Sequence, residues 1–127
     1  EVRRIVITTP ATFAELAIND TMASGQYIPK GSRILAVWKG HGTGTASSTF
    51  DLGLRKRDGT VIDADGLVAV SALTTATTVD VSCGTGDLVA AGVDYVTTDE
   101  AEVYLTAQGA VLAANQDVRI TVEYVGP

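Results

Sequence analysis

Apolar and polar residues alternate along several short stretches of the chain, which is the pattern of strands that bury one face. The alternation is clearest at 118–124 and is repeated at 3–8, 49–56 and 101–107. The side chains expected to face a core are Val118, Ile120, Val122, Tyr124, Ile5, Ile7, Phe50, Leu52, Leu54, Val103 and Leu105. Because 118–124 is so regular, we expect it to be held firmly within a sheet, beside the first strand.

The segment 32–39 differs from these because it is apolar on both sides. Its two faces are Ile34, Ala36 and Trp38, and Leu35 and Val37. Apolar residues on both faces are typical of a central strand that is covered on both sides. We therefore expect one side to lie in the domain core and the other, through Leu35 and Val37, to form a subunit contact.

Turn residues interrupt the chain at short intervals, which favours a sandwich or barrel of short strands. Asp58-Gly59 is the strongest hairpin signal and is expected to join 52–57 to 60–62 as antiparallel neighbours. Weaker strand patterns cover 16–18, 26–28, 74–83 and 93–96.

One short helix is compatible with the sequence, at 66–73. Leu67, Val70 and Leu73 are spaced three apart there, and two aspartates precede them, where a helix N-terminus favours carboxylates. The sequence therefore predicts an all-β fold: an antiparallel β-sandwich or jelly roll of about eight short strands with at most one short helix. We expect a single domain spanning 1–127, with a flattened barrel as the alternative architecture.

The charge of the chain restricts its partners. The 127 residues carry a formal net charge of −6 and the pI is about 4.5. An acidic domain repels phosphate backbones, so no nucleic-acid partner is expected. No apolar run approaches the roughly 20 residues of a membrane-spanning helix, and no signal peptide is visible, so no membrane partner is expected either. The chain begins at Glu1, so we expect a native start upstream or a trimmed end.

Catalytic chemistry has little support in the sequence. His41 is the single histidine and lies between two glycines, without a Gly-x-Ser-x-Gly element near it. Nucleophilic catalysis needs a nucleophile, a base and an orienting group, and no such set is visible. We therefore expect no catalytic residues, no enzyme activity and no cofactor.

Metal binding is also poorly supported. One histidine and one cysteine, Cys83, cannot form a transition-metal site, and the single cysteine excludes an intramolecular disulfide. Calcium needs only oxygen ligands, so Asp63 with Asp65, or 99–102, are conceivable sites, although neither matches the calcium-binding loop of twelve residues. Helix capping and solvated loops explain these acids more simply, and we expect no metal.

Several motifs resemble small structural proteins encoded among the head genes of tailed phages. The segments that carry the resemblance are Leu16-Ala17-Ile18-Asn19-Asp20-Thr21, Ile28-Pro29-Lys30-Gly31-Ser32-Arg33-Ile34-Leu35, Ser47-Ser48-Thr49-Phe50-Asp51-Leu52-Gly53 and 117–125. The resemblance covers most of the chain as a style of sequence. It implies a virion structural protein, and specifically a capsid decoration (cement) protein that binds the outer shell and stabilises contacts between capsomers.

The resemblance also implies partners and a location. They are the major capsid protein and further copies of the chain, with a homotrimer favoured, on the capsid surface of a virion made in the host cytoplasm. The interface candidates are Leu35, Val37, Arg3, Arg4, Arg55, Lys56 and Arg57, with the basic residues meeting an acidic capsid surface. A tail tube, a head–tail adaptor, a fibre base and a carbohydrate-binding module stay open as alternatives. The last would need exposed aromatic side chains from the set Trp38, Tyr27, Tyr95 and Tyr104.

Overall fold

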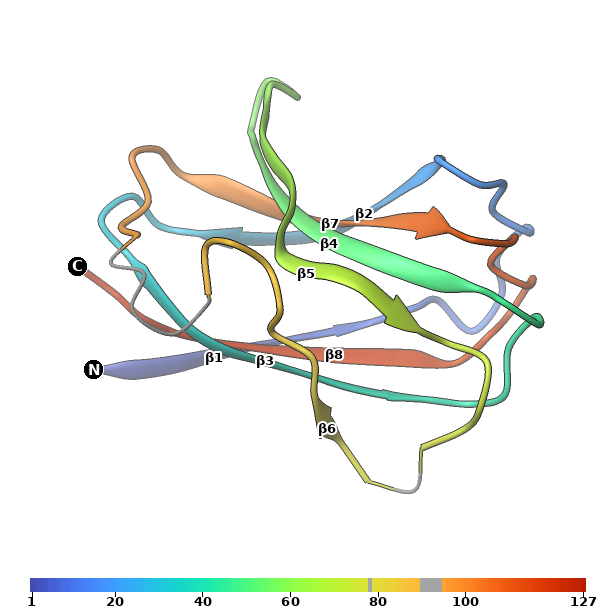
Figure 1. Cartoon of the computed structure of the whole chain (residues 1–127). Helices are drawn as coiled ribbons and strands as arrows, with labels where there is room; N and C mark the ends of the chain where they lie inside the picture. Colours follow the sequence, from blue (N-terminus) through green and yellow to red (C-terminus); the bar gives the residue numbers. More distant parts are fainter. Residues whose placement is uncertain (78, 90–94) are drawn as a thin grey trace.

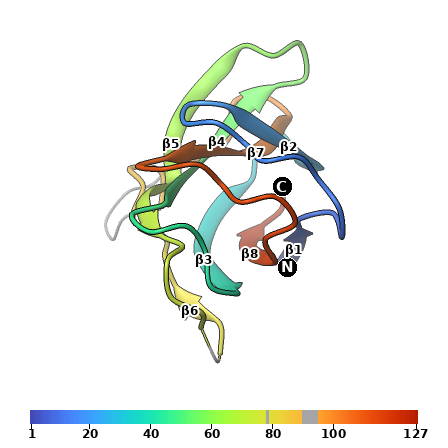
Figure 2. The same ribbon diagram turned by 90° about the vertical axis from the view of Figure 1, so that its right-hand side faces the viewer.

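The computed structural model describes residues 1–77, 79–89 and 95–127, which form two antiparallel sheets of four strands each. The first sheet has the strand order β1-β8-β3-β6 and the second has the order β2-β7-β4-β5. The sheets lie face to face as two layers, with the β4–β5 hairpin projecting beyond the body of the molecule (Figures 1 and 2). The predicted all-β antiparallel sandwich is confirmed, and the described residues contain no helix.

The strands at 2–8, 49–56, 101–108 and 118–125 follow the alternating segments of the sequence closely. Their bounds are β1 Val2–Thr8, β2 Thr21–Ile28, β3 Arg33–His41, β4 Thr49–Lys56, β5 Val61–Ala72, β6 Val81–Ser82, β7 Ala101–Gln108 and β8 Val118–Val125. No helix among the described residues is long and apolar enough to cross a membrane.

The first sheet is organised around the last strand. β8 pairs with β1 in a register that places Val2 opposite Val125 and Thr8 opposite Arg119. On its other side β8 pairs with β3, so the prediction that the last regular strand lies beside the first is confirmed. The inward row of β8 is fully buried, as its alternation predicts.

The second sheet contains the predicted hairpin. β4 and β5 are antiparallel neighbours joined at Asp58-Gly59, where Lys56 N donates to Thr60 O at 2.8 Å. Gly59 has a φ of +94°, a conformation that glycine adopts without the strain of a Cβ. The hairpin prediction is therefore confirmed.

The core lies between the two inward faces. Phe50, Leu52 and Leu54 of β4 are at most 1% exposed, and they pack in one cluster with the inward residues of β8 and β7. Burying such side chains stabilises the fold by about 1.5–3 kcal/mol each, so the two alternating rows account for much of the driving force for folding.

The structure corrects the faces predicted for β3. A register shift between Ile34 and Ala36 against β8 marks a β-bulge, which moves the following residues by one position. As a result Ile34 and Val37 are buried in the core, whereas Leu35 is 38% exposed. Leu35 and Val37 therefore do not share an outer face, and Val37, with no exposed surface, is not available for a subunit contact.

The helix predicted at 66–73 was wrong, because residues 66–72 belong to β5. Three register shifts against β4 bend the strand and break its alternation, so the apolar residues acquire a spacing that mimics a helix. Val70 shows this most clearly: it has a φ of +52° and points into solvent, and its backbone N is held by Asp51 Oδ1 at 2.8 Å.

The weaker strand predictions fared less well. Residues 16–18 contribute only a bridge between Leu16 and Leu112, and 26–28 is the end of the longer β2. Of the described residues of 74–83 only Val81–Ser82 form a strand, and Val79 and Val81 are exposed whereas Cys83 is buried. Residues 78, 93 and 94 of the predicted segments lie outside the described residues, and Tyr95 and Val96 are not in a strand.

Candidate functional site

The outer face of the β1-β8-β3-β6 sheet combines apolar, aromatic and charged side chains in one surface. The pairing registers align Val6, Thr121, Trp38 and Ser82 in a single row across all four strands. Val6 is 53% exposed and Trp38 is half-buried. We call this surface, made of Arg4, Val6, Trp38, Asp80 and Thr121, the Trp38 face; these residues line a shallow hollow of about 360 Å³.

Charged pairs border the Trp38 face on two sides. The Arg4 guanidinium lies 5.8 Å from the centroid of the Trp38 ring, and Arg4 Nε is 3.0 Å from Glu123 Oε2. Arg119 forms an ion pair with Asp80, which raises the pKa of Arg119 through a hydrogen bond and charge attraction. Because each cation has an anion beside it, this face is locally balanced in charge although the chain is acidic.

The second sheet presents a different outer surface, in which basic residues are neutralised within the chain. Arg55 Nε is 2.8 Å from Glu102 Oε1, Lys56 Nζ is 3.6 Å from Asp99 Oδ2, and Arg57 is 2.6 Å from Glu100 Oε1. The Arg55 guanidinium also lies 4.8 Å from the Tyr104 ring centroid, and that of Arg57 lies 4.0 Å from the Tyr27 centroid. We call this set of three ion pairs the Arg55–Arg57 ladder.

The Arg55–Arg57 ladder pairs two groups of residues that were considered separately in the sequence: the basic interface candidates at 55–57 and the calcium candidate at 99–102. Arg55, Lys56 and Arg57 remain interface candidates, but each already has an acidic partner. The acids that were considered for calcium at 99–102 are the same partners. Among the described residues no group of three or more metal-ligating side chains is present. The other calcium candidate is Asp63 with Asp65. Burial raises the pKa of Asp63 most, and a side-chain hydrogen bond with Asp65 raises it further.

The remaining interface candidates are not brought together in one place. Arg4 belongs to the Trp38 face, whereas Arg3 lies on the opposite side of β1, with its Nε 3.5 Å from Glu1 Oε1. Leu35 projects at the bulge of β3. Three residues of the Trp38 face were not identified from the sequence: Val6, Thr121 and Asp80. Val6 could have been found, because it is an apolar residue out of phase with Ile5 and Ile7.

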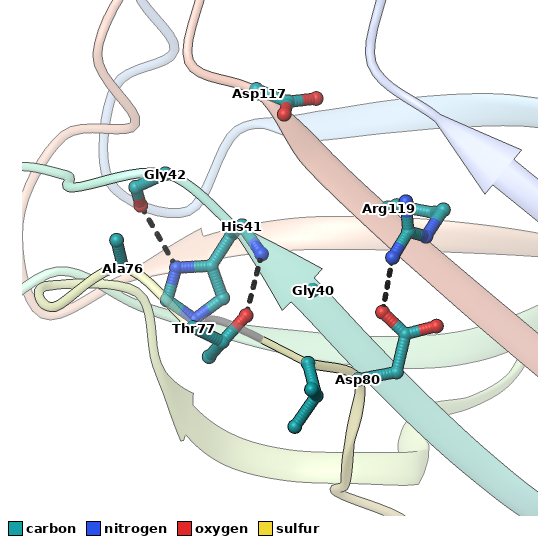
Figure 3. Close-up of a pocket in the computed structure, with 9 residues that line it drawn as sticks. Gly40, His41, Gly42, Ala76, Thr77, Asp80, Asp117 and Arg119 are labelled. Atoms are coloured by element: carbon teal, nitrogen blue, oxygen red, sulfur yellow. Dashed lines mark hydrogen bonds and ion pairs between the residues drawn. The ribbon is translucent and has the colours of Figure 1, made fainter.

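A polar pocket at the end of β3 contains the only histidine. It has a volume of about 360 Å³, and Figure 3 shows His41, Thr77, Asp80 and Arg119 around it. His41 Nδ1 donates to Gly42 O at 2.9 Å, and the buried Nε2 has no hydrogen-bond partner among the described residues. Ser48 Oγ donates to Thr45 O, so it is not paired with the imidazole. Within the part of the chain that the structure describes, no hydroxyl group is hydrogen-bonded to the His41 imidazole; Thr77 Oγ1 accepts from the His41 backbone N instead.

Two solved structures match the whole chain. A chain of the capsid of Ralstonia phage GP4 aligns with a TM-score of 0.72 and 14% sequence identity, covering 100% of this chain and 85% of that chain. A chain of the capsid asymmetric unit of cyanophage Pam1 aligns with a TM-score of 0.61 and 19% identity, covering 100% and 84%. The fold occurs in phage capsids. The resemblance to proteins of phage heads is thus confirmed at the level of the fold.

Sequence comparison adds no closer relative. No protein-family model matches the chain, and no curated protein matches it. The likeness therefore rests on the fold, over the entire length of the chain.

Proposed function

We propose that the chain is a structural protein of a phage virion, and specifically a decoration (cement) protein that binds the outer surface of the capsid. The observation that carries this proposal is the fold shared with the Ralstonia phage GP4 capsid chain over 100% of the present chain. In this proposal the partner is the major capsid protein, the location is the capsid surface, and the protein is made in the host cytoplasm.

The contrast between the two outer faces supports a role in binding through one of them. The Trp38 face offers a half-buried aromatic ring, exposed Val6 and balanced charges, the mixture found at interfaces with other proteins. The other sheet satisfies its charged groups internally and suits exposure to solvent. A net charge of −6 favours solubility at the high local density of a capsid surface.

Self-association through Leu35 is the second part of the proposal, with a trimer favoured. Leu35 is the exposed apolar residue at the β3 bulge. Leu35→Asp is expected to prevent self-association and keep the fold, because the side chain is outside the core. Native mass spectrometry of both proteins tests this. A trimer that persists in the variant contradicts a contact through Leu35.

The decisive experiment is binding to undecorated shells. The purified chain is mixed with expanded capsids that lack it, and bound protein is measured by sedimentation and located by cryo-electron microscopy. Saturable binding at fixed positions on the outside supports decoration. Density confined to the tail tube, the head–tail adaptor or a fibre base instead assigns the chain to one of those virion components.

A carbohydrate-binding module is the second candidate, favoured by one observation. Tyr104 is buried, but Trp38, Tyr27 and Tyr95 are partly exposed, so the aromatic criterion does not exclude sugar binding. Arg57 covers one face of Tyr27, which leaves Trp38, beside Asp80 and Thr121, as the ring most open to a sugar. A glycan array with the wild type and Trp38→Ala distinguishes this candidate from decoration.

A further inference from the structure

The outer edge of β1 is open. Among the described residues β1 pairs only with β8, and β2, at the corresponding edge of the other sheet, pairs only with β7. Figure 2 shows β1 and β2 on the same side of the sandwich. An open strand edge presents unpaired peptide groups that can template another strand.

The register identifies which peptide groups point outward. Thr9 N donates to Val118 O at 3.0 Å, which fixes the odd-numbered residues of β1 as those that bond to β8. In an antiparallel ladder the alternate residues point their N–H and C=O groups the other way. The peptide groups of Val2, Arg4, Val6 and Thr8 therefore face the open edge.

An apolar cavity lies directly beside this edge. It has a volume of about 170 Å³ between β1 and β2, and its walls include Ile7, Met22, Leu52, Leu105 and Ile120. These residues come from both sheets, so the cavity opens into the hydrophobic core at the mouth of the sandwich. Its size suits one aliphatic side chain, the kind of pocket that gives specificity in strand addition.

The N-terminal end of the β1 edge carries two positively charged side chains. Arg3 and Arg4 are adjacent near the start of β1, on opposite faces of the strand. Among the described residues Arg3 forms an ion pair only with the exposed Glu1, at 3.5 Å, and such a pair contributes little in solvent. A second copy of β1 at this edge would place four arginines in one two-stranded ribbon, where like charges repel, so a different and acidic segment fits better.

We propose that the β1 edge accepts an extended segment of a partner polypeptide as an additional antiparallel strand. The segment carries aliphatic residues opposite Ile7 and Ile5, the first of which enters the cavity, and an acidic residue opposite Arg3. The proposal rests on the proposed function only for the source of the segment, which is the shell protein. The β1 edge would thus extend the first sheet to five strands.

A peptide titration tests the edge without capsids. The probe is Thr-Leu-Thr-Val-Glu-Glu-Thr at up to millimolar concentration, and a peptide of the same composition with the alternation scrambled is the control. Amide hydrogen exchange and NMR shifts of Arg4, Val6 and Thr8 are followed. Protection of these amides by the probe alone supports the proposal; no protection, or equal protection by the scrambled peptide, overturns it.

Two variants of Val6 sharpen the test. Val6→Pro removes an N–H that points to the open edge, where proline is tolerated, and is expected to weaken probe binding by about tenfold or more, the loss of one hydrogen bond. Val6→Thr keeps the N–H and is the matched control, expected to bind within about threefold of wild type. Thr8→Pro replaces Val6→Pro if that variant does not fold. Equal binding by proline variant and wild type contradicts strand addition.

Two further measurements separate this proposal from the proposed function. Native mass spectrometry that finds a dimer abolished by Val6→Pro assigns the edge to a second copy and overturns the proposal. If wild type binds undecorated shells and Val6→Pro binds them equally, decoration stands and the β1 edge is excluded. If the probe protects β1 but wild type does not bind shells, the edge stands and the source of the segment is wrong.

Discussion

The two sheets of the sandwich use their outer faces in opposite ways. In β7 every residue from Ala101 to Ala107 is buried, because the Arg55–Arg57 ladder and the curled start of β5 cover the outer side of its sheet. In β8, by contrast, only the inward residues are fully buried, and Thr121 and Glu123 stay partly open beside Trp38. One sheet is therefore complete within the chain, while the other keeps a surface that a partner can bind.

The largest expected effect comes from disturbing the covered sheet at Gly53. A Cβ at this position would overlap the carbonyl oxygens of Asp63 and Ala64, where β5 passes over β4. Gly53→Ala is expected to lower the free energy of unfolding by about 3 kcal/mol, because backbone atoms cannot move aside easily. Gly42→Ala is the matched control, since nothing lies within 4 Å of its Cβ position. Urea denaturation of both variants measures the difference, and equal midpoints would contradict close packing at Gly53.

The next effect contrasts one ion pair from each sheet. The Arg55–Glu102 pair is largely shielded, with side chains 22% and 11% exposed, whereas Arg4 is 65% exposed in its pair with Glu123. Arg55→Ala leaves a shielded carboxylate without a partner and is expected to cost about 2 kcal/mol, against less than about 1 kcal/mol for Arg4→Ala. Thermal unfolding of the two variants compares them. Equal losses would show that the ladder is no more important than a surface pair.

The next prediction concerns the pH dependence of stability, through the Cys83 thiol that follows β6 in the β1-β8-β3-β6 sheet. Burial raises the pKa of the Cys83 thiol to about 12 from an ordinary value of 9.0. The folded state therefore keeps a proton that the unfolded state releases. Stability that is fully present below pH 9.0 is lost as the pH rises towards 12, at up to about 1.4 kcal/mol per pH unit.

Cys83→Val removes this titration and serves as the reference for the pH effect. Burial lowers the pKa of Lys39, which contributes in the opposite direction in both proteins, and the charge of the Cys83 thiolate raises it in the wild type alone. The difference between the two proteins therefore reports the thiol together with its attraction to Lys39. The difference in unfolding free energy between wild type and Cys83→Val, measured from pH 8 to pH 12 by urea denaturation, is expected to change steadily above pH 9. A flat difference would mean that the thiol is accessible in the folded state.

The smallest expected effect on stability is that of Trp38→Ala. The ring lies on the outer face of its sheet, so we expect a loss of less than about 1 kcal/mol in unfolding free energy, together with at least about tenfold weaker binding to undecorated shells. The comparison uses thermal unfolding and a shell sedimentation assay. Unchanged shell binding would remove the Trp38 face from the interface and leave the β1 edge and Leu35 as candidates.

The sequence predicted those elements whose local pattern and tertiary environment agree. β4 and β8 alternate regularly, and Asp58-Gly59 favours the turn that joins β4 to β5, so all three were found within a residue or so. β3 and β5 contain bulges that depend on neighbouring strands, and one extra residue reverses which side chains face the core. This explains both the misplacement of Val37 and the false helix at 66–73.

The candidate site was predictable only in part. Arg4 was identified from its charge, and Trp38 was placed on one face of a central strand covered on both sides. The cross-strand row that joins Trp38 to Val6 and Thr121 depends on the order β1-β8-β3, which periodicity along one strand does not contain. The pairing of Arg55 and Arg57 with acids more than forty positions away was hidden for the same reason.

The central place of β8 has a consequence for biosynthesis. β1 and β3 are joined in their sheet only through β8, so this sheet cannot close until residues 118–125 have emerged from the ribosome. Contacts between distant parts of a chain form slowly. Until β8 is available, β1 and β3 lack the strand that joins them in the sheet. The Trp38 face, which is built across β1, β8 and β3, does not exist on a growing chain. Attachment to a partner through that face is therefore restricted to molecules whose synthesis has passed the final strand.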